Sequence, residues 1–332
     1  MSSQIQKLVS KSTRTKALHL TVYLLDLWSF IPYYMAHLCN ALRGAGVDAR
    51  LGSVRYHLDR NYFRSAGSKP DSFLLDFGGG VKANFLRRIV KTAEYLANLF
   101  VIGLRLTFSR LDILHVQFLP FLDRGFRFEL WFVRWVHSRG IRIVHTVHNL
   151  LDRDSREGGK PLFEELYGLV DAIICHGQEA REKLKKDFGV PIEKIWVIPH
   201  GPLFVGKPTE SKKDCREKLG LPVDETIVLC AGVISEYKGI PFLLDAWKTQ
   251  VESGAKSRLV IAGTGDAGLL AQIREKVERE GLRSSVTLWL RFIAVEEIPL
   301  LHQAADILVY PYKAGTTSGA LLTGLNYEKI GE

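Results

Sequence analysis

Residues 304–319 read AADILVYPYKAGTTSG, and this stretch decides which fold the chain can adopt. Ile307, Leu308 and Val309 form a short apolar run, as expected for a strand buried on both faces of a parallel sheet. The polar cluster that follows, with Ser318 at its end, predicts a helix cap whose free backbone N–H groups face an anion, and phosphate is the ligand we expect. In the alternative interpretation, the hydroxyls of this cluster only cap the helix.

The composition of the chain describes an ordinary globular protein with room for two domains. Of its 332 residues, 46% are hydrophobic and 24% are charged, which is the usual balance for folded domains. The cysteines lie far apart and form no CxxC pair: Cys39, Cys175, Cys215 and Cys230. We therefore expect buried free thiols and a reducing, cytoplasmic environment.

Charge and targeting signals narrow the classes of partner. A net charge of +9 favours an anionic partner, which is a nucleotide, a nucleic acid or an acidic lipid surface. The opening segment, MSSQIQKLVSKSTRTK, is polar and basic and lacks a following apolar core with a cleavage site, so no secretory signal is expected. No uncharged apolar stretch approaches the roughly 20 residues that span a bilayer.

Strand-like apolar runs alternate with amphipathic helical stretches along the chain, which predicts parallel-sheet α/β domains. Strands are predicted over residues 17–25, 49–54, 113–119, 141–147, 172–176 and 195–198, and again over 226–231, 257–262, 285–289 and 306–310. Helices are predicted near residues 31–43, 81–106, 126–138, 162–169 and 179–188, and again near 241–250, 267–280, 296–304 and 318–327. The predicted fold class is α/β, with two Rossmann-like, doubly wound parallel sheets.

A change in composition separates the two sets of units. The segment after His200, GPLFVGKPTESKKD, is rich in Gly, Pro, Lys and Ser and is typical of a linker. We predict an N-terminal domain over residues 1–203 and a C-terminal domain over residues 204–332. Open α/β sheets bind ligands at the carboxyl ends of their strands, so function is expected in a cleft shared by the two domains.

Glycine-containing turns follow the first two strands of the C-terminal domain. Residues 232–239, GVISEYKG, carry Lys238 just before a helix, where a lysine can reach a diphosphate. The alternative is a lysine that is simply solvated. Gly263 and Gly265 follow the next strand, where small residues allow a ligand to come close. Each signal is weak alone, and their succession on neighbouring strands favours a phosphate site.

Four turns follow successive strands of the C-terminal domain, at Gly232–Gly239, Gly263–Gly265, Arg291–Ile293 and Thr316–Gly319. In order and spacing they resemble the donor-binding domain of GT-B glycosyltransferases of the group 1, or family 4, class. The resemblance covers nearly the whole chain and is strongest from Trp196 to Glu328. It implies a GT-B fold and transfer of a sugar from a nucleotide-sugar donor, with retention and without an obligatory metal.

The resemblance also assigns roles to particular residues. Lys238 is expected to bind the donor phosphates and to act in catalysis with His148, because positive charge and a helix dipole stabilise the departing nucleoside diphosphate. The expected donor-binding residues are Gly232, Ser235, Lys238, Gly263, Gly265, Arg291, Phe292, Thr316, Thr317, Ser318 and Gly319. The N-terminal domain is expected to bind the acceptor.

The chain departs from the class pattern at three places. Val233 stands where many members have a phosphate-binding Arg, while Thr316 and Gly324 stand where the glutamates of a Glu-x7-Glu motif belong. Arg291–Ile293 and Thr317–Gly319 match a subgroup that carries Arg-Phe-Ile and Thr-Ser-Gly there. Relatives also continue past the last helix with another α/β unit, so the C-terminal domain is expected to be truncated.

Five histidines lie in or at the ends of successive predicted strands: His115, His145, His148, His176 and His200. His145 and His148 are three residues apart on an extended segment and point to opposite faces, and no pair has a metal-ligand spacing, so no metal site is predicted. By the resemblance, His148 lies beside the transferred sugar, and Asn149 assists in acceptor binding. A histidine that only closes the strand end is the alternative interpretation.

The loop after the first strand, Asp26-Leu27-Trp28-Ser29-Phe30, replaces a glycine-rich segment of many relatives. An aspartate and aromatic rings suit hydrogen bonding to and stacking on a sugar, so Asp26, Trp28 and Phe30 are predicted to bind the acceptor. In the alternative interpretation, Trp28 and Phe30 are core residues that cover the next helix.

Residues 81–110 combine basic side chains with apolar ones at helical spacing. Two interpretations stay open. Such a helix lies on an anionic membrane, where a lipid-linked acceptor is found, or it is a core helix with a solvated basic face.

The leading hypothesis is a cytoplasmic glycosyltransferase of the hexosyltransferase type, peripheral at the inner face of the membrane. It needs no cofactor beyond its UDP- or GDP-sugar substrate, and its acceptor is a polysaccharide or lipid-linked glycan. Two alternatives stay open: a catalytically degenerate binding subunit, favoured by the motif departures, and a sugar-nucleotide epimerase on the same architecture. No nucleic-acid partner is expected, because the basic residues are dispersed and match no nucleic-acid motif.

Overall fold

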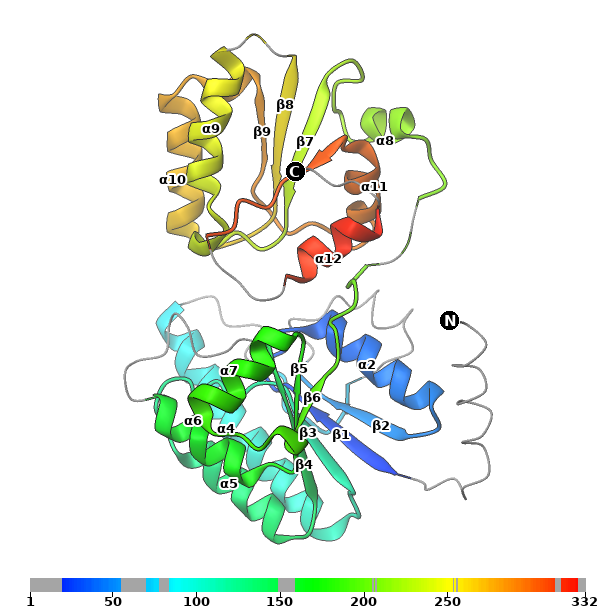
Figure 1. Cartoon of the computed structure of the whole chain (residues 1–332), viewed down its shortest axis with the longest axis vertical. Coiled ribbons are helices and arrows are strands. Elements are labelled where there is room, and N and C mark those ends of the chain that lie inside the picture. Colours follow the sequence, from blue (N-terminus) through cyan, green and yellow to red (C-terminus); the bar gives the residue numbers. More distant parts are fainter. Residues whose placement is uncertain are drawn as a thin grey trace. The chain divides into compact units, whose positions relative to one another are not determined.

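The computed structural model divides into two compact units, Met1–Ile198 and Pro199–Glu332 (Figure 1). It describes residues 20–54, 70–77, 84–148, 159–204, 206, 208–252, 254, 256–313 and 318–327. The division falls between Ile198 and Pro199, whereas the sequence placed the domain boundary between Leu203 and Phe204. The two units are described separately below as unit 1 and unit 2.

Unit 1 is built on a parallel sheet in the order β2-β1-β3-β4-β5-β6. Its strands are β1 (Thr21–Leu25), β2 (Asp48–Gly52), β3 (Ile113–Val116), β4 (Arg142–Val147), β5 (Ala172–Cys175) and β6 (Ile195–Val197). Its helices are α2 (Pro32–Gly44), α4 (Asn84–Phe108), α5 (Phe128–Ser138), α6 (Gly159–Leu169) and α7 (Gln178–Phe188), followed by the short 3₁₀ helix η2 (Ile192–Lys194).

Both faces of this sheet are covered, as a parallel sheet requires. Leu24 on β1 packs with Met35 and Cys39 of α2 in one apolar cluster. On the opposite face, Leu114 and Ile143 belong to a larger cluster that includes α4, α5, α6 and α7. The apolar side chains of the strands point alternately to these two cores, which explains why the strands read as continuous apolar runs.

Unit 2 is a parallel sheet in the order β10-β7-β8-β9. Its strands are β7 (Thr226–Ala231), β8 (Ser257–Ala262), β9 (Val286–Trp289) and β10 (Ile307–Leu308). Its helices are α8 (Lys212–Lys218), α9 (Ile240–Glu252), α10 (Ala267–Arg279), α11 (Glu297–Ala304) and α12 (Gly319–Asn326), with 3₁₀ turns η3 (Glu236–Lys238) and η4 (Leu282–Ser284). One cluster packs α9 and α10 on the sheet, and a second packs α8 and α11 on its other face. The predicted α/β class with two doubly wound sheets is confirmed.

The helix α8 is missing from the sequence interpretation, because its first residues, 212–214, were assigned to the linker. The sequence does contain a signal for the start of this helix, which is a capping box. The Ser211 side chain accepts from the Asp214 amide, and the Asp214 side chain accepts from the Ser211 amide. Arg216 of α8 is buried and pairs with Asp306, so the helix is fixed against the sheet. The strand predicted over 306–310 is also shorter than expected, because Pro311 has no N–H to extend the ladder.

The structure also bears on the predicted free thiols and on the membrane-spanning potential of the helices. Cys39, Cys175, Cys215 and Cys230 are all free and buried, as predicted. Across the described ranges, no helix combines the length and the apolar character needed to cross a membrane.

Candidate functional site

The ammonium of Lys238 is the central feature of unit 2. Lys238 closes η3 after β7 and is only 8% exposed. Its Nζ lies 3.0 Å from the position that a Cβ on Gly232 would take, and 5.3 Å from the centre of the Tyr312 ring. Among the described residues, no acidic side chain forms an ion pair with it. Burial lowers the pKa of Lys238, and the nearby Cys230 partly opposes that shift.

The loop between β10 and α12 packs directly on the turn that follows Lys238. The Lys313 amide donates to the Tyr237 carbonyl at 2.8 Å. Gly239 has φ of +68°, and a Cβ there would lie 2.1 Å from the Pro311 carbonyl oxygen. Only glycine fits this left-handed, crowded position, and the close approach places Tyr312 beside the lysine.

The N-terminus of α12 meets the same place. A Cβ on Gly232 would lie 3.3 Å from Ala320 Cβ as well as beside Lys238 Nζ. Ser318 caps the helix by accepting from the Leu321 amide at 3.2 Å, and its hydroxyl lies 3.1 Å from that of Tyr312. A buried ammonium and a helix N-terminus are therefore neighbours, and both favour negative charge. Thr316 and Thr317 lie outside the described residues.

The glycines of the next turn have a structural explanation. A Cβ on Gly263 would lie 1.9 Å from the Gly232 carbonyl oxygen, and one on Gly265 would lie 2.3 Å from that of Ile234. The Ile234 amide also donates to the Thr264 carbonyl at 2.7 Å, so the two turns continue the β7–β8 ladder. The close approach that these glycines allow is to the neighbouring turn, and their donor-binding role stays a prediction.

Ser235 and Arg291 differ in how their polar groups are used. The Ser235 hydroxyl is buried and has no hydrogen-bond partner in the structure. Arg291, which is half exposed, makes two hydrogen bonds to the Glu297 carboxylate, at 2.6 and 2.8 Å. This ion pair lowers the pKa of Glu297. Arg291 would have to leave its partner to bind a donor, while the neighbouring Phe292 presents an exposed ring.

Gly319 and Gly324 also sit in crowded places. A Cβ on Gly319 would lie 2.7 Å from Leu203 Cδ1, and one on Gly324 would lie 2.1 Å from the Tyr310 hydroxyl oxygen. Tyr310 donates to the Ala320 carbonyl at 3.0 Å, which holds its hydroxyl against α12. The hydroxyl of Tyr310 thus fills the space that the second glutamate of the class motif needs.

Replacement of Gly324 by Ala tests this packing. We expect Gly324→Ala to lower the free energy of unfolding by about 1–2 kcal/mol, because overpacking costs roughly 1–3 kcal/mol and exceeds the gain of up to about 1 kcal/mol in helix propensity. In a Tyr310→Phe background the same change should cost less, because the hydroxyl is gone while Leu308 Cδ1 still lies 2.8 Å from the added Cβ. Urea unfolding of the four proteins of this cycle measures the coupling; equal costs in both backgrounds would contradict the contact.

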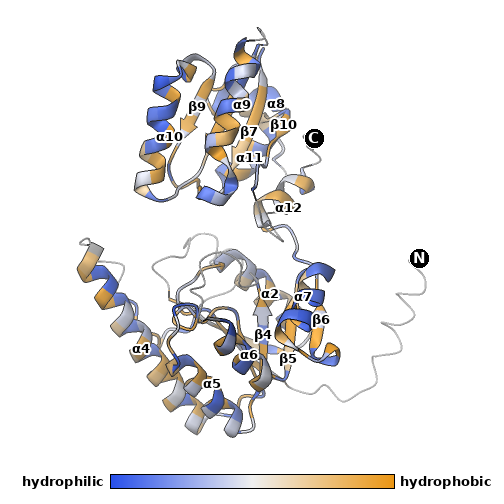
Figure 2. Cartoon of the chain, turned by 60° about the vertical axis from the view of Figure 1, so that its left-hand side comes forward, coloured by the Kyte–Doolittle hydropathy of each residue, from blue (hydrophilic) through white to orange (hydrophobic). Residues whose placement is uncertain are grey.

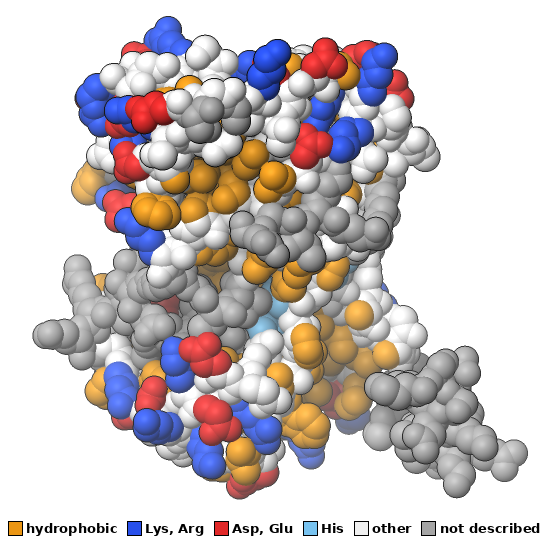
Figure 3. All heavy atoms as spheres, turned by 45° about the horizontal axis from the view of Figure 1, so that its top comes forward, with side chains coloured by type: hydrophobic (Ala, Val, Ile, Leu, Met, Phe, Trp, Pro, Cys, Tyr) orange, Lys and Arg blue, Asp and Glu red, His pale blue; other side chains and the backbone are white. Residues whose placement is uncertain are grey.

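In unit 1, His148 directly follows β4 and lies in a row of polar side chains. Its Nδ1 lies 3.1 Å from His176 Nε2, and its Nε2 lies 2.8 Å from Gln117 Oε1. The Phe118 ring stacks on His148, and the Tyr34 ring packs edge-on against both histidines. Histidine side chains reach the surface of unit 1 (Figure 3).

Two other histidines are core residues. The rings of His115 and His145 are buried, with His115 Nε2 at 2.7 Å from Thr146 Oγ1 and His145 Nδ1 at 3.1 Å from the Val116 carbonyl. Burial lowers the pKa of His115 to about 3 and that of His145 to about 4, so both are neutral at pH 7. No group of three His, Cys, Asp or Glu side chains in the described part of the chain is arranged to hold a metal.

The side chains of the loop after β1 differ in exposure. Asp26 is only 1% exposed, and its carboxylate accepts from the Ile31 amide at 3.2 Å, so it holds the turn before α2. Burial raises its pKa to about 6. Trp28 packs on Tyr95 and belongs with the core, whereas Phe30 is half exposed. Of Asp26, Trp28 and Phe30, Phe30 has the most exposed side chain, and the role of these residues in acceptor binding stays a prediction. Asn149 lies outside the described residues.

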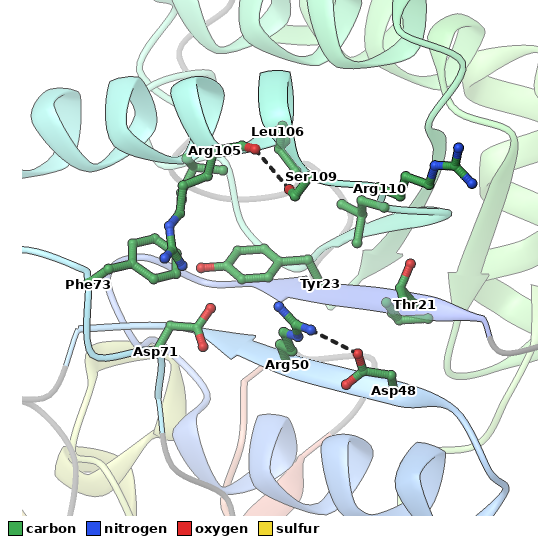
Figure 4. Close-up of a pocket in the computed structure, with 13 residues that line it drawn as sticks. Thr21, Tyr23, Asp48, Arg50, Asp71, Phe73, Arg105, Leu106, Ser109 and Arg110 are labelled. Atoms are coloured by element: carbon green, nitrogen blue, oxygen red, sulfur yellow. Dashed lines mark hydrogen bonds and ion pairs between the residues drawn. The ribbon is translucent and has the colours of Figure 1, made fainter.

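A small cavity of about 50 Å³ lies where β1 and β2 begin, at the end of these strands away from the loop that follows β1 (Figure 4). Arg50 pairs there with Asp48 at 3.0 Å, and the Arg105 guanidinium lies 3.8 Å from the centre of the Phe73 ring. Burial and nearby Asp71 raise the pKa of Tyr23. The charged groups that line this cavity face one another, and the cavity is too small for a nucleotide.

Sequence reasoning missed several residues of the two sites. Tyr310 ends the strand predicted over 306–310 and Tyr312 follows it, and Tyr312 could have been recognised as an aromatic neighbour of Lys238 once β10 was placed beside β7. Gln117 follows β3 and His176 follows β5, and these two strands are the neighbours of β4. The order of the strands would therefore have shown that both residues lie beside His148.

Two doubly wound parallel-sheet units, each covered by helices on both faces, define the class of proteins with a GT-B fold. Residues 31–201 match the family model described as Glycosyltransferase Family 4, and residues 211–320 match the model described as Glycosyl transferases group 1, so the chain belongs to this glycosyltransferase family.

Curated relatives match parts of the chain. D-inositol 3-phosphate glycosyltransferase of Streptomyces bingchenggensis is 27% identical over 55% of this chain and 42% of its own length. Alpha-monoglucosyldiacylglycerol synthase of Streptococcus pneumoniae is 29% identical over 60% of this chain and 46% of its own length. The matches therefore span less than half of the length of these relatives.

Solved structures match nearly the whole chain. A glycosyltransferase from Rickettsia africae has a TM-score of 0.69 and 14% identity, with 94% of this chain and 78% of that chain covered. HepE of Anabaena, solved in complex with UDP and glucose, has a TM-score of 0.67 and 16% identity over 94% of this chain and 80% of that chain. At these identities the likeness shows the fold alone.

Proposed function

We propose that the chain transfers a sugar from a UDP- or GDP-sugar to a polysaccharide or lipid-linked glycan acceptor, with retention and without a metal or other cofactor. The observation that carries the proposal is the buried ammonium of Lys238, which has no acidic partner among the described residues and lies beside the N-terminus of α12. A buried charge without a partner is costly, so a site that keeps one is built for an anion.

The chemistry of this site is electrostatic. Negative charge develops on the oxygen of the departing nucleoside diphosphate as the bond to the sugar breaks. Lys238 and the backbone amides at the start of α12 are in place to stabilise that charge. HepE of Anabaena, which shares the fold, has been solved with UDP and with UDP-glucose, which supports a uridine nucleotide as the first donor to test.

A thermal-shift screen of UDP-, GDP-, ADP- and dTDP-sugars identifies the donor, because a ligand that binds only the folded state raises the melting temperature. We expect one of the UDP- or GDP-sugars to give the largest shift. Incubation with that donor then separates the three functions: an epimerase isomerises it without an acceptor, and a degenerate subunit binds it without turnover. A screen with no shift for any nucleotide sugar would contradict the proposal.

We also propose that α4 places unit 1 on an anionic membrane. Six apolar side chains at spacings of four or seven residues form an exposed stripe along this helix: Phe85, Ile89, Leu96, Phe100, Leu104 and Phe108. The opposite side of α4 carries Tyr95, Leu99 and Ile102 into the core. Figure 2 shows the apolar residues of α4 interspersed with hydrophilic ones, and the exposed basic side chain of Arg88 suits anionic headgroups.

Phe100 and Phe108, which are 72% and 84% exposed, are the natural targets for a test. We expect Phe100→Ser with Phe108→Ser to reduce binding to vesicles that contain phosphatidylglycerol by about tenfold or more, since each exposed ring contributes roughly 1 kcal/mol or more when it enters the interface. Phe242→Ser in unit 2, where Phe242 is also exposed, is the matched control. Sedimentation with vesicles measures binding; equal binding by both variants would overturn the proposal.

A further inference from the structure

The strand register of unit 1 aligns the last residues of β4, β5 and β6. The next residue on each strand therefore lies in one row, and these residues are His148, His176 and Ile198. His176 Nδ1 lies 2.9 Å from the Ile198 carbonyl oxygen, and His176 Nε2 lies 3.1 Å from His148 Nδ1. A backbone carbonyl is thus connected to His148 through a second imidazole.

The carbonyl fixes the protons along this row. A carbonyl oxygen only accepts hydrogen bonds, so His176 Nδ1 carries a proton and donates it to Ile198. Burial lowers the pKa of His176, which keeps the ring neutral, and its Nε2 therefore offers a lone pair. The bond between the two rings then requires that His148 Nδ1 is the donor.

Gln117 completes the arrangement at the other nitrogen of His148. Its Oε1 lies 2.8 Å from His148 Nε2, while its own Nε2 is buried and has no hydrogen-bond partner among the described residues. The oxygen and nitrogen of a side-chain amide exchange places by a simple rotation, and the hydrogen-bond network decides between them. With the amide nitrogen toward His148, Gln117 donates to the lone pair of a neutral His148.

We propose that His176 is a positioning residue, which fixes His148 as its Nδ1–H tautomer and leaves His148 Nε2 as a hydrogen-bond acceptor for a sugar hydroxyl that takes the place of the Gln117 amide. This inference rests on the proposed function, because it says how His148 meets the substrate. His148 thus accepts from the sugar, and the orientation of its ring is held from behind by His176.

The tautomer is measured on the unliganded full chain by long-range ¹H–¹⁵N correlation spectra of histidine-labelled protein, with His148→Gln used for assignment. We expect His148 to show a protonated Nδ1 and an unprotonated Nε2. His176→Phe keeps a ring against Tyr34 but removes both nitrogens, and we expect it to give a mixture of tautomers. His176→Gln keeps a donor and an acceptor and should restore the single tautomer, and it also covers the case in which the Phe variant does not fold.

Kinetics supply the second readout. We expect His176→Phe to lower kcat roughly tenfold, the size of one lost hydrogen bond, with the donor KM unchanged. His176→Gln should recover most of that loss, and His137→Phe on the exposed side of α5 should have no effect. A protonated Nε2 in the wild type, or an unaltered tautomer in His176→Phe, overturns the inference. The expected tautomer in a protein that never transfers sugar contradicts the proposed function alone.

Discussion

Replacement of Lys238 by Met should weaken binding of the donor nucleotide about 100-fold, because a charge-assisted contact to phosphate is worth roughly 1.5–3 kcal/mol. The same change should raise the stability of the free protein. Met has nearly the length of Lys, fills the space beside Gly232 and Tyr312, and removes a desolvated ammonium that lacks an acidic partner among the described residues. We expect a gain of about 1–2 kcal/mol in the free energy of unfolding.

The opposite signs of these two effects make the prediction specific. If Lys238 only filled space, its replacement would lower the stability of the protein and would leave nucleotide binding unchanged. Titration calorimetry with the best nucleotide and urea unfolding of the free protein measure the two quantities. Lys248→Met, at an exposed position of α9, is the matched control and should change neither. Tight binding by the Lys238→Met variant would remove the lysine from the donor site.

Glu129 should show the largest effect on stability in unit 1. Its carboxylate is fully buried and accepts from the Tyr95 hydroxyl, from the Phe121 amide at 3.0 Å and from the Leu122 amide at 2.5 Å. We expect Glu129→Ala to lower the free energy of unfolding by about 3–5 kcal/mol, because it leaves three buried donors without an acceptor. The carboxylate anchors the loop between β3 and α5, which begins with Gln117, so the His148 site should be disturbed as well.

The pH dependence of this effect has a definite sign. Burial raises the pKa of Glu129 from 4.5 to about 7, so the folded state keeps a proton that the unfolded chain has already released. The stability from this group is therefore fully present below about pH 4.5 and is lost as the pH rises through 7. The gap in unfolding free energy between the wild type and Glu129→Gln should be larger at pH 5 than at pH 8. Urea unfolding at the two pH values measures it, and a gap that widens with rising pH would contradict this account.

The sequence predicts the architecture because both sheets are buried on two faces. Continuous apolar runs such as Leu259–Ala262 favour strands buried on both faces, and their alternation with amphipathic stretches predicts a doubly wound fold. The helix α8 was missed because a linker composition and a capping box occur in the same segment, and the buried pair between Arg216 and Asp306 is a contact across 90 residues that local patterns do not show.

The sequence predicts the candidate site only in part. The position of Lys238 after β7 follows from the turn itself, and the structure places it beside Gly232 and the start of α12. Asp26 was assigned to the acceptor because its residue type suits a sugar, but exposure depends on how the chain turns after β1. The turn directs this carboxylate inward to the Ile31 amide. Residue type gives the chemistry, and only the fold gives the direction in which it points.

The measurement that tests the central claim most directly is release of nucleoside diphosphate from the best donor. It is followed for the wild type and for Lys238→Met with a panel of glycan and lipid-linked acceptors, and the anomeric configuration of the product is read by NMR. We expect acceptor-dependent release by the wild type, a retained configuration in the product, and loss of release in the variant. Release that is equally fast in Lys238→Met would contradict it.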